Sequence, residues 1–185
     1  MNIQRSLWFV ATLVLGFGTA AMADDSAKAA ARKKEIDSAA QTTLDKLGKD
    51  EPNAKELLSK SVGYAVFTVT KGGFLVSAGA GNGVVIDKAS GNRTYMRMGM
   101  GGVGLGIGAQ RYALVVIFEN RERMEKFVAG GWDSSATAEA AAGKEGKAAR
   151  TTFYDGVAYY QITEKGLMAH ADITGTKFWV NEDLR

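Results

Sequence analysis

The sequence predicts an α+β fold: a coiled, antiparallel, glycine-rich sheet of about six strands with an N-terminal amphipathic helix and one or two further helices. Three observations predict it. Apolar residues recur at helical spacing over 27–47. From Gly63 onward, β-branched and aromatic runs alternate with turn signals. Between Gly99 and Gly108, glycine becomes the commonest residue.

Residues 1–23 are typical of a signal peptide. Arg5 supplies a positive charge, an apolar stretch follows, and Ala21-Met22-Ala23 is a small-x-small cleavage site. The apolar stretch of about 12 residues is shorter than the roughly 20 that a membrane-spanning helix needs. The chain has no cysteine, and therefore no thiol for a lipoprotein anchor. We expect an exported, periplasmic protein whose mature chain begins at Asp24.

The part of the chain after the predicted signal peptide is long enough for one domain with a single core. Its expected segments are a helical N-terminal part over 24–62, a glycine-rich β meander over 63–118, a helix and an Ala-rich loop over 119–150, and C-terminal strands over 151–185. The formal net charge of the whole chain is only +3, so we expect no nucleic-acid partner.

Local signals place the helices. The first is expected over 27–47 and ends at Gly48, because glycine is the usual residue after a helix. Pro52 favours the first turn of a second, short helix that reaches Ser61. Asn120 is a suitable N-cap for a third helix over 121–129.

Period-two patterns and β-branched runs place the strands. They are expected at 64–70, 74–87, 93–98 continuing into the glycine run, 112–118, 157–162 and 167–173. Lys71-Gly72-Gly73 is a turn signal that ends the first strand. The strand at 112–118 is expected to close the meander.

The glycine run has a regular pattern. Glycine occupies every second position at Gly102, Gly104, Gly106 and Gly108. Successive side chains of a strand point to opposite faces, so these four glycines would leave one face of a strand bare. Glycine weakens a strand unless something needs the room. We expect close packing at this bare face.

The same run contains a Gly-x-Gly-x-x-Gly match at Gly99, Gly101 and Gly104. A dinucleotide-binding fingerprint opens a helix, whose N-terminus holds the pyrophosphate. Here the match continues into the strand-like segment 112–118. The context is therefore wrong for a nucleotide site.

The chain offers few groups for catalysis or metal binding. His170 is the only histidine, and it lies two residues before Asp172. No serine sits in a Gly-x-Ser-x-Gly elbow, and no histidine or cysteine cluster exists. We expect no catalytic residue, no metal and no cofactor.

The first expected helix carries the basic residues Lys28, Arg32, Lys33 and Lys34. Near an anionic bilayer each contributes roughly 1 kcal/mol. The alternative interpretation is a solvated helix face. Trp132 and Trp179 are candidate interfacial anchors, although a tryptophan that follows a helix also suits a lid over the core.

Several motifs follow one another along the chain in a characteristic order. They are Gly63-Tyr64-Ala65-Val66-Phe67, Lys71-Gly72-Gly73-Phe74, Gly79-x-Gly81-x-Gly83-Val84, the Gly99–Gly108 run with Gln110, Val115-Val116-Ile117-Phe118 and Lys165-Gly166-Leu167-Met168. Together they resemble the SYLF domain, also called the yeast actin-regulator domain. The resemblance covers the chain from about Ala27 onward.

This resemblance implies lipid binding. Eukaryotic members are implicated in binding phosphoinositide membranes, partly through an amphipathic N-terminal helix, and yeast members in binding actin. Carried over, the helix at 27–47 supplies Lys28, Arg32, Lys33 and Lys34 as headgroup contacts. Family members often carry Gly-Pro after the Ala-rich stretch, whereas this chain has Ala142-Gly143-Lys144.

The predicted compartment narrows the expected partners, because a periplasmic protein meets neither actin nor, ordinarily, phosphoinositides. The leading hypothesis is a non-enzymatic domain in peripheral contact with anionic phospholipid or another acyl-bearing envelope molecule. The alternative is a protein-interaction scaffold of the envelope, in which the bare glycine face accepts a strand from another chain. Filament binding, as in the yeast members, is a third option.

Overall fold

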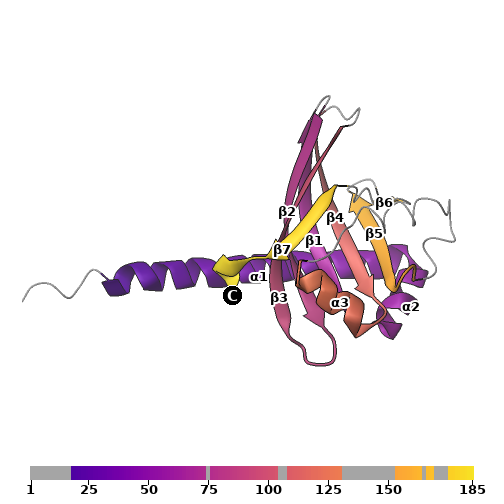
Figure 1. The fold of residues 1–185 in the computed structure, drawn as a ribbon, viewed down its shortest axis with the longest axis horizontal. Helices are drawn as coiled ribbons and strands as arrows, with labels where there is room; N and C mark the ends of the chain where they lie inside the picture. Colours follow the sequence, from indigo (N-terminus) through magenta and orange to yellow (C-terminus); the bar gives the residue numbers. More distant parts are fainter. Residues whose placement is uncertain (1–17, 74–75, 104–107, 131–152, 164–165, 169–174) are drawn as a thin grey trace, which may run out of the picture.

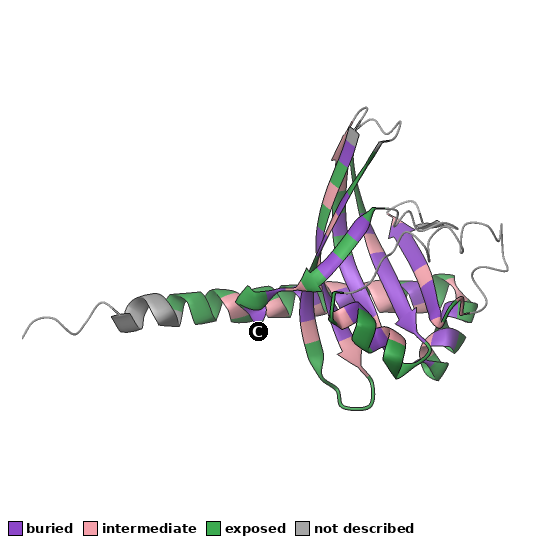
Figure 2. Ribbon diagram, viewed as in Figure 1, coloured by how far each residue is buried: buried purple, intermediate pink, exposed green. Residues whose placement is uncertain are grey.

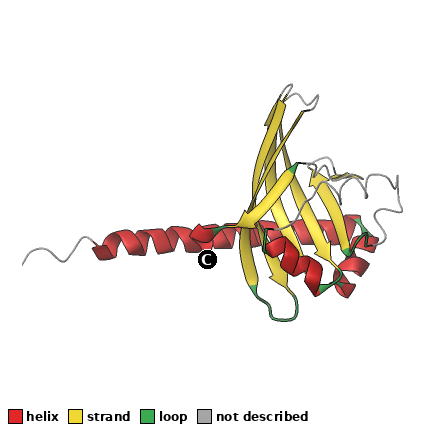
Figure 3. Ribbon diagram, in the orientation of Figure 1, coloured by secondary structure: helices red, strands yellow, loops and turns green. Residues whose placement is uncertain are grey.

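The structure is a computed structural model that describes residues 18–73, 76–103, 108–130, 153–163, 166–168 and 175–185. One antiparallel sheet forms the middle layer (Figures 1 and 3). The helices α1 and α2 pack on one face of this sheet, and α3 packs on the other. The α+β class predicted from the sequence is confirmed.

Helix α1, Gly18–Asp50, crosses one face of the sheet. Its buried stripe comprises Ile36, Ala40 and Leu47, and the turns over 24–32 project beyond the sheet and are mostly exposed (Figure 2). The helix starts earlier than expected, and Gly48 does not end it. The break comes at Glu51, whose backbone is extended because the next residue is a proline.

Helix α2, Pro52–Lys60, begins with the proline at its first turn, as predicted. Ala54 and Leu57 are buried on the α1 side of the sheet. Lys88 Nζ donates to the carbonyl oxygens of Leu58, Ser59 and Ser61 at 2.6, 3.1 and 3.0 Å. This cation therefore satisfies acceptors that the C-terminus of a helix leaves open.

Seven strands make up the sheet. They are β1 Gly63–Gly73, β2 Val76–Asp87, β3 Arg93–Val103, β4 Gly108–Phe118, β5 Val157–Thr163, β6 Gly166–Met168 and β7 Thr176–Val180. Their order is β6-β5-β4-β1-β2-β3-β7, and every pair is antiparallel. A short 3-10 helix, η2 Glu182–Leu184, follows β7.

Two details of the expected strand arrangement are wrong. Lys71-Gly72-Gly73 is the end of β1 and not a turn. β4 does not follow β3 in the sheet but returns to pair with the other edge of β1. The physical reason is burial, because Val66 and Val115 contribute to one core while Phe67 and Leu114 contribute to the other. Strands that are apolar on both faces belong in the middle of a sheet.

The expected bare strand at Gly102–Gly108 is also wrong. β3 ends at Val103 and β4 begins at Gly108, so Gly102 and Gly108 lie on strands separated by β1 and β2. Gly104 and Gly106 lie outside the described residues. A Cβ on Gly102 would come no closer than 4.0 Å to Ser77 Oγ, so no described residue packs tightly there.

The close packing occurs instead on β2, on the α3 side of the sheet. Its glycines pair with methionines of β3: Gly79 with Met100, Gly81 with Met98 and Gly83 with Met96. A Cβ on Gly81 would lie 2.7 Å from Thr68 O and 2.9 Å from Met98 Cγ. The side chains of Met100 and Met98 therefore occupy the space that Gly79 and Gly81 leave, and the Phe67 ring occupies the space at Gly83.

Helix α3, Arg121–Val128, covers this second core. Asn120 Oδ1 accepts a hydrogen bond from the Arg123 N–H at 3.0 Å, which confirms the predicted N-cap. The Phe178 ring of β7 lies 4.7 Å from Phe127 and 5.1 Å from Phe67 of β1, between ring centroids. In a flat sheet the backbones of β1 and β7 would be about 14 Å apart, so these contacts reflect a strongly coiled sheet.

Candidate functional site

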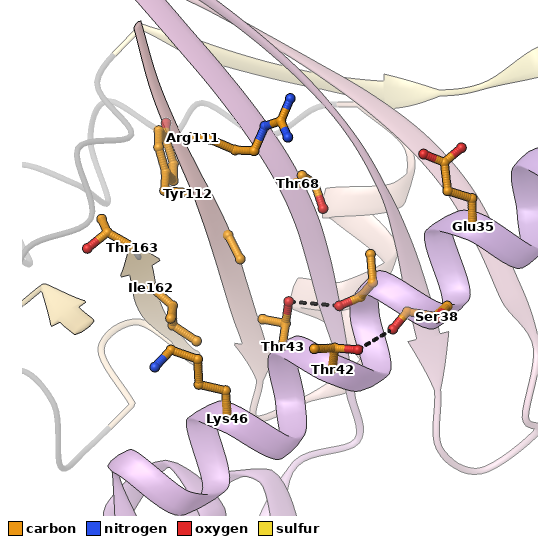
Figure 4. Close-up of a pocket in the computed structure, with 12 residues that line it drawn as sticks. Glu35, Ser38, Thr42, Thr43, Lys46, Thr68, Arg111, Tyr112, Ile162 and Thr163 are labelled. Carbon is orange, nitrogen blue, oxygen red and sulfur yellow. Dashed lines mark hydrogen bonds between the residues drawn. The ribbon is translucent and has the colours of Figure 1, made fainter. Parts of the chain in front are cut away.

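The corner between α1 and the sheet is hollowed (Figure 4). The first hollow measures about 610 Å³ and lies between α1 and the strands β1, β4 and β5. The helix contributes Glu35, Ser38, Ala39, Thr42, Thr43 and Lys46, and the strands contribute Thr68, Arg111, Tyr112, Ala113, Ile162 and Thr163. Its lining combines hydroxyl groups, small apolar groups and two cations.

Helical periodicity explains the wall that α1 presents to this hollow. Ala39, Thr42 and Lys46 are spaced three or four residues apart, so they share one stripe beside the buried stripe. The hydroxyls of Thr42 and Thr43 donate to backbone carbonyls of the preceding turn at 3.0 and 2.8 Å. A hydroxyl oxygen that donates in this way still accepts hydrogen bonds from a ligand.

The cations Arg111 and Lys46 lie on opposite walls of the first hollow (Figure 4). Lys46 Nζ is 2.8 Å from Asp50 Oδ2. Glu35, the carboxylate in the lining, is 3.0 Å from Arg32. In the described part of the chain, no carboxylate forms an ion pair with Arg111. The hollow therefore suits an anionic group near Arg111.

A second hollow of about 630 Å³ lies further towards the N-terminus of α1. Lys28 and Arg32 of α1 line it together with Arg97 of β3 and Asp183 of η2. Arg97 Nη2 lies 2.6 Å from Asp183 Oδ2. The two hollows adjoin, because Thr68 of the first and Asn82 of the second are partners across β1 and β2.

The basic residues predicted as headgroup contacts do not form one patch. Lys28, which pairs with Asp24, and Arg32 line the second hollow. Lys33 packs against the sheet, with its Nζ 5.4 Å from the centroid of the Tyr95 ring. Lys34 is exposed elsewhere on the helix. Consecutive helical residues are about 100° apart, so neighbours in sequence face different ways.

Trp179, a predicted anchor, is 44% exposed on the edge strand β7. It pairs with Arg97, and its ring carbon Cη2 lies 3.2 Å from where a Cβ on Gly99 would be. The other predicted anchor, Trp132, lies outside the described residues, as do His170 and Asp172.

Charged and aromatic groups fix α1 to the strands beside the hollows. Asp37 Oδ2 accepts hydrogen bonds from Tyr95 Oη at 3.0 Å and lies 2.6 Å from Arg93 Nη1. Burial raises the pKa of Tyr95, and the Asp37 carboxylate raises it further. The same carboxylate raises the pKa of Arg93. The position of the helix wall is therefore set by a tertiary contact.

Arg111 is a site residue that the sequence interpretation missed. It stands alone between Gln110 and Tyr112, with no other basic residue nearby in sequence. A signal was available in the pattern, because Arg111 is the one charged residue on the strand face that it shares with Ala113, Val115 and Ile117. Nothing local shows that this position faces a helix from the other end of the domain.

The described residues contain no group of three or more His, Cys, Asp or Glu side chains arranged to hold a metal ion. None of the helices in the described ranges is both long and apolar enough to cross a membrane.

The structure is that of a small α+β domain with two surface hollows beside its first helix. The family model "Ysc84: Las17-binding protein actin regulator" matches residues 99–185. Beta cell expansion factor A of Aeromonas veronii is 38% identical over 149 residues, which cover 80% of this chain and 57% of that protein. The SH3 domain-containing YSC84-like protein 1 of Xenopus laevis is 33% identical over 111 residues, or 58% of this chain and 32% of that protein.

The chain belongs to the SYLF, or Ysc84, family. It spans 57% and 32% of the lengths of these two curated relatives. The family consists of domains that interact with lipids or proteins, and this chain is a domain of that general kind.

Proposed function

We propose that this chain is a lipid-binding domain that engages anionic phospholipid, or another acyl-bearing envelope molecule, at the corner between α1 and the sheet. The observation that carries the proposal is Arg111, a cation without a carboxylate partner among the described residues, on the wall of a hollow with apolar groups. Family membership supports the lipid class, since the family includes lipid-interaction domains.

The chemistry of the first hollow suits a phospholipid headgroup. A guanidinium presents several donors in one plane and matches phosphate oxygens. The hydroxyls of Thr42 and Thr43 remain acceptors for hydroxyl groups of a glycerol or sugar. Ala113 and Ile162 offer apolar contacts to the first atoms of an acyl chain.

Lys28 and Arg32 extend the attraction for anionic lipid along α1. Their ion pairs with Asp24 and Glu35 join exposed side chains of neighbouring helical turns. Exposed ion pairs of this kind contribute about 0–1 kcal/mol, so phosphates readily replace the carboxylates. Each basic side chain near an anionic bilayer then adds about 1 kcal/mol.

We also propose that residues 1–23 act as a signal peptide and that the domain works in the periplasm. The support is the charge, apolar stretch and cleavage pattern of this segment. Its direct test is N-terminal sequencing of the protein recovered from the periplasm. A chain that begins at Asp24 agrees with the proposal, and an intact Met1 contradicts it.

Vesicle co-sedimentation tests the lipid proposal. The chain from Asp24 onward is mixed with phosphatidylcholine vesicles with or without phosphatidylglycerol. We expect recovery with the anionic vesicles only, and about fivefold weaker partitioning for Arg111→Gln. Lys55→Gln, on α2 outside both hollows, is the matched control and retains the parental partitioning.

The vesicle experiment also separates the contributions of the basic residues of α1 to lipid binding. Because Lys33 packs against Tyr95, Lys28→Gln and Arg32→Gln are expected to weaken binding more than Lys33→Gln. Equal recovery of the parent protein with neutral and anionic vesicles rejects the headgroup proposal.

A protein-interaction function remains the second candidate, because two strands extend past their neighbours. β7 pairs with β3 only over Met96–Met100, and β5 pairs with β4 only over Tyr112–Phe118. Among the described residues, no strand pairs with this edge of β4 over 108–111, whose backbone groups could therefore accept a strand from another chain. Photo-crosslinking from Ala109 in intact cells tests this, and capture of lipid alone counts against it.

A further inference from the structure

The side of the sheet that faces α1 is nearly bare beyond the helix. Strand registers align two rows there, Thr70, Ala80 and Gly99 in one and Gly72, Ala78 and Gly101 in the next. We call these six residues the small-residue face. Each is exposed or half-buried (Figure 2).

Internal packing explains only part of the bareness of this face: the Trp179 ring lies 3.2 Å from a Cβ position on Gly99, but no such contact accounts for Gly101 among the described residues. On the opposite side of the same strands, glycines are needed because Met98 and Met100 lie across β2. No described residue lies within 4 Å of a Cβ position on Gly101 on the outer side, and Gly101 has no positive φ. Glycine inside a strand costs about 0.5–1 kcal/mol relative to alanine. The missing side chain at Gly101 therefore favours contact with a molecule outside the protein.

Cations stand at both ends of one row of the small-residue face. Thr70 pairs with Arg111 of β4, and Gly99 pairs with Lys177 of β7. Arg111 and Lys177 are therefore separated by four strand spacings, or about 19 Å. Neither forms an ion pair with a described residue, and neither row contains a carboxylate.

Trp179 completes the surface. It is the exposed large hydrophobic residue of the described chain, and its ring lies over Gly99 beside Lys177. Tryptophan favours the boundary between headgroups and acyl chains, because its ring is apolar and its N–H is polar. A surface with few side chains that carries a tryptophan and two flanking cations matches the anionic surface of a lipid bilayer.

We propose that the small-residue face docks on the surface of an anionic phospholipid bilayer, with Trp179 at the interface and with Arg111 and Lys177 on lipid phosphates. This inference rests on the proposed lipid-binding function and goes beyond it, because it assigns the contact with the bilayer to the strands. Helix α1 runs along the base of this face, so Lys28 and Arg32 approach the same bilayer.

A charge placed on the bare face tests the docking. Gly101→Glu and its neutral isostere Gly101→Gln have room in the structure, and Gly101 lies outside both hollows. Both proteins carry Trp132→Phe, which leaves Trp179 as the tryptophan of the chain from Asp24 onward. Equal melting temperatures of the two variants establish that both are folded.

With vesicles of phosphatidylcholine and phosphatidylglycerol, Gly101→Glu is expected to partition about fivefold more weakly than Gly101→Gln. The Trp179 emission of Gly101→Gln shifts to the blue and is quenched by lipid brominated near the headgroup. Lys177→Gln weakens partitioning, whereas Lys126→Gln on α3, across the sheet, does not.

Equal partitioning of Gly101→Glu and Gly101→Gln, or an unquenched Trp179 in bound protein, overturns the docking inference. If Arg111→Gln still weakens binding in that case, the proposed function survives and the hollow alone holds the lipid. If the parent protein binds no anionic vesicle, the inference and the proposed function both fail.

Discussion

At the scale of single residues, glycines with the same sequence pattern serve different purposes. Gly81 on β2 makes room for Met98, while Gly101 on β3 faces open space. Alternation along a strand reveals that one face is bare. It does not reveal whether a neighbouring side chain fills the vacant space, because that depends on strand pairing.

This difference yields a stability prediction. Gly81→Ala places a Cβ against the Thr68 carbonyl and the Met98 side chain, so we expect the free energy of unfolding to fall by about 1–3 kcal/mol. Gly101→Ala meets nothing and is expected to be neutral or slightly stabilising. Urea denaturation measures both. Equal losses for the two variants would show that the pairing of β2 with β3 is wrong.

At the scale of secondary-structure elements, the features that could be predicted from the sequence are those that depend only on residues close together in the chain. The Asn120 cap and the Pro52 start belong to this group. The position of β4 does not, because its choice between β1 and β3 as neighbours depends on burial in the whole sheet. Gly48 predicts the end of α1, but the helix continues to Asp50 because the proline constraint on Glu51 decides where it stops.

The candidate site was predictable only in part for the same reason. Lys28 and Arg32 were visible as a basic segment of a helix, and both line a hollow. Arg111 and Lys177 are isolated cations, far apart in the chain, that five aligned strands bring to one row. The sequence alone does not give the strand registers, so it contains no signal that Arg111 and Lys177 lie in one row.

A contact between elements gives a prediction of pH dependence. Asp87, at the end of β2, accepts from Arg121 Nη1 of α3 at 3.1 Å. This bond, with those from the Ala89 N–H and the Ser90 hydroxyl, lowers the pKa of Asp87 from 3.8 to about 2. A lowered carboxyl pKa stabilises the fold above the unfolded value, and this contribution is lost as the pH falls through the folded value.

We therefore expect Asp87→Asn to lower the free energy of unfolding at neutral pH and to have a steadily smaller effect between about pH 4 and pH 2. Urea titrations of both proteins across this range measure the difference. Glu119→Gln, an exposed carboxylate nearby in sequence to Arg121, serves as the control and changes little. A difference between Asp87→Asn and the parent that does not vary with pH would contradict this account.

At the scale of the whole molecule, two cores lie on the two faces of the sheet. In the core on the α3 side, Phe127 joins strands that are distant in the sheet, because its ring contacts Phe67, Phe118 and Phe178. Those partners come from β1, β4 and β7. Loss of this ring therefore affects the central strands and an edge strand together.

Phe127→Ala is expected to lower the free energy of unfolding by about 3–5 kcal/mol, since it removes a fully buried aromatic ring. Phe127→Leu, which keeps more of the volume, should cost clearly less. Chemical denaturation followed by circular dichroism measures both variants. An alanine variant as stable as the parent would refute the packing role of this ring.

The return of β4 to the middle of the sheet has a consequence for biosynthesis. β1 acquires its first partner from the adjacent hairpin, but its second long edge, Gly63–Gly73, stays unpaired until the segment up to Phe118 has emerged and folded back. Non-local pairing of this kind slows folding, and an open apolar strand edge invites association with other chains. The folding chain is therefore prone to aggregation until β4 pairs with β1.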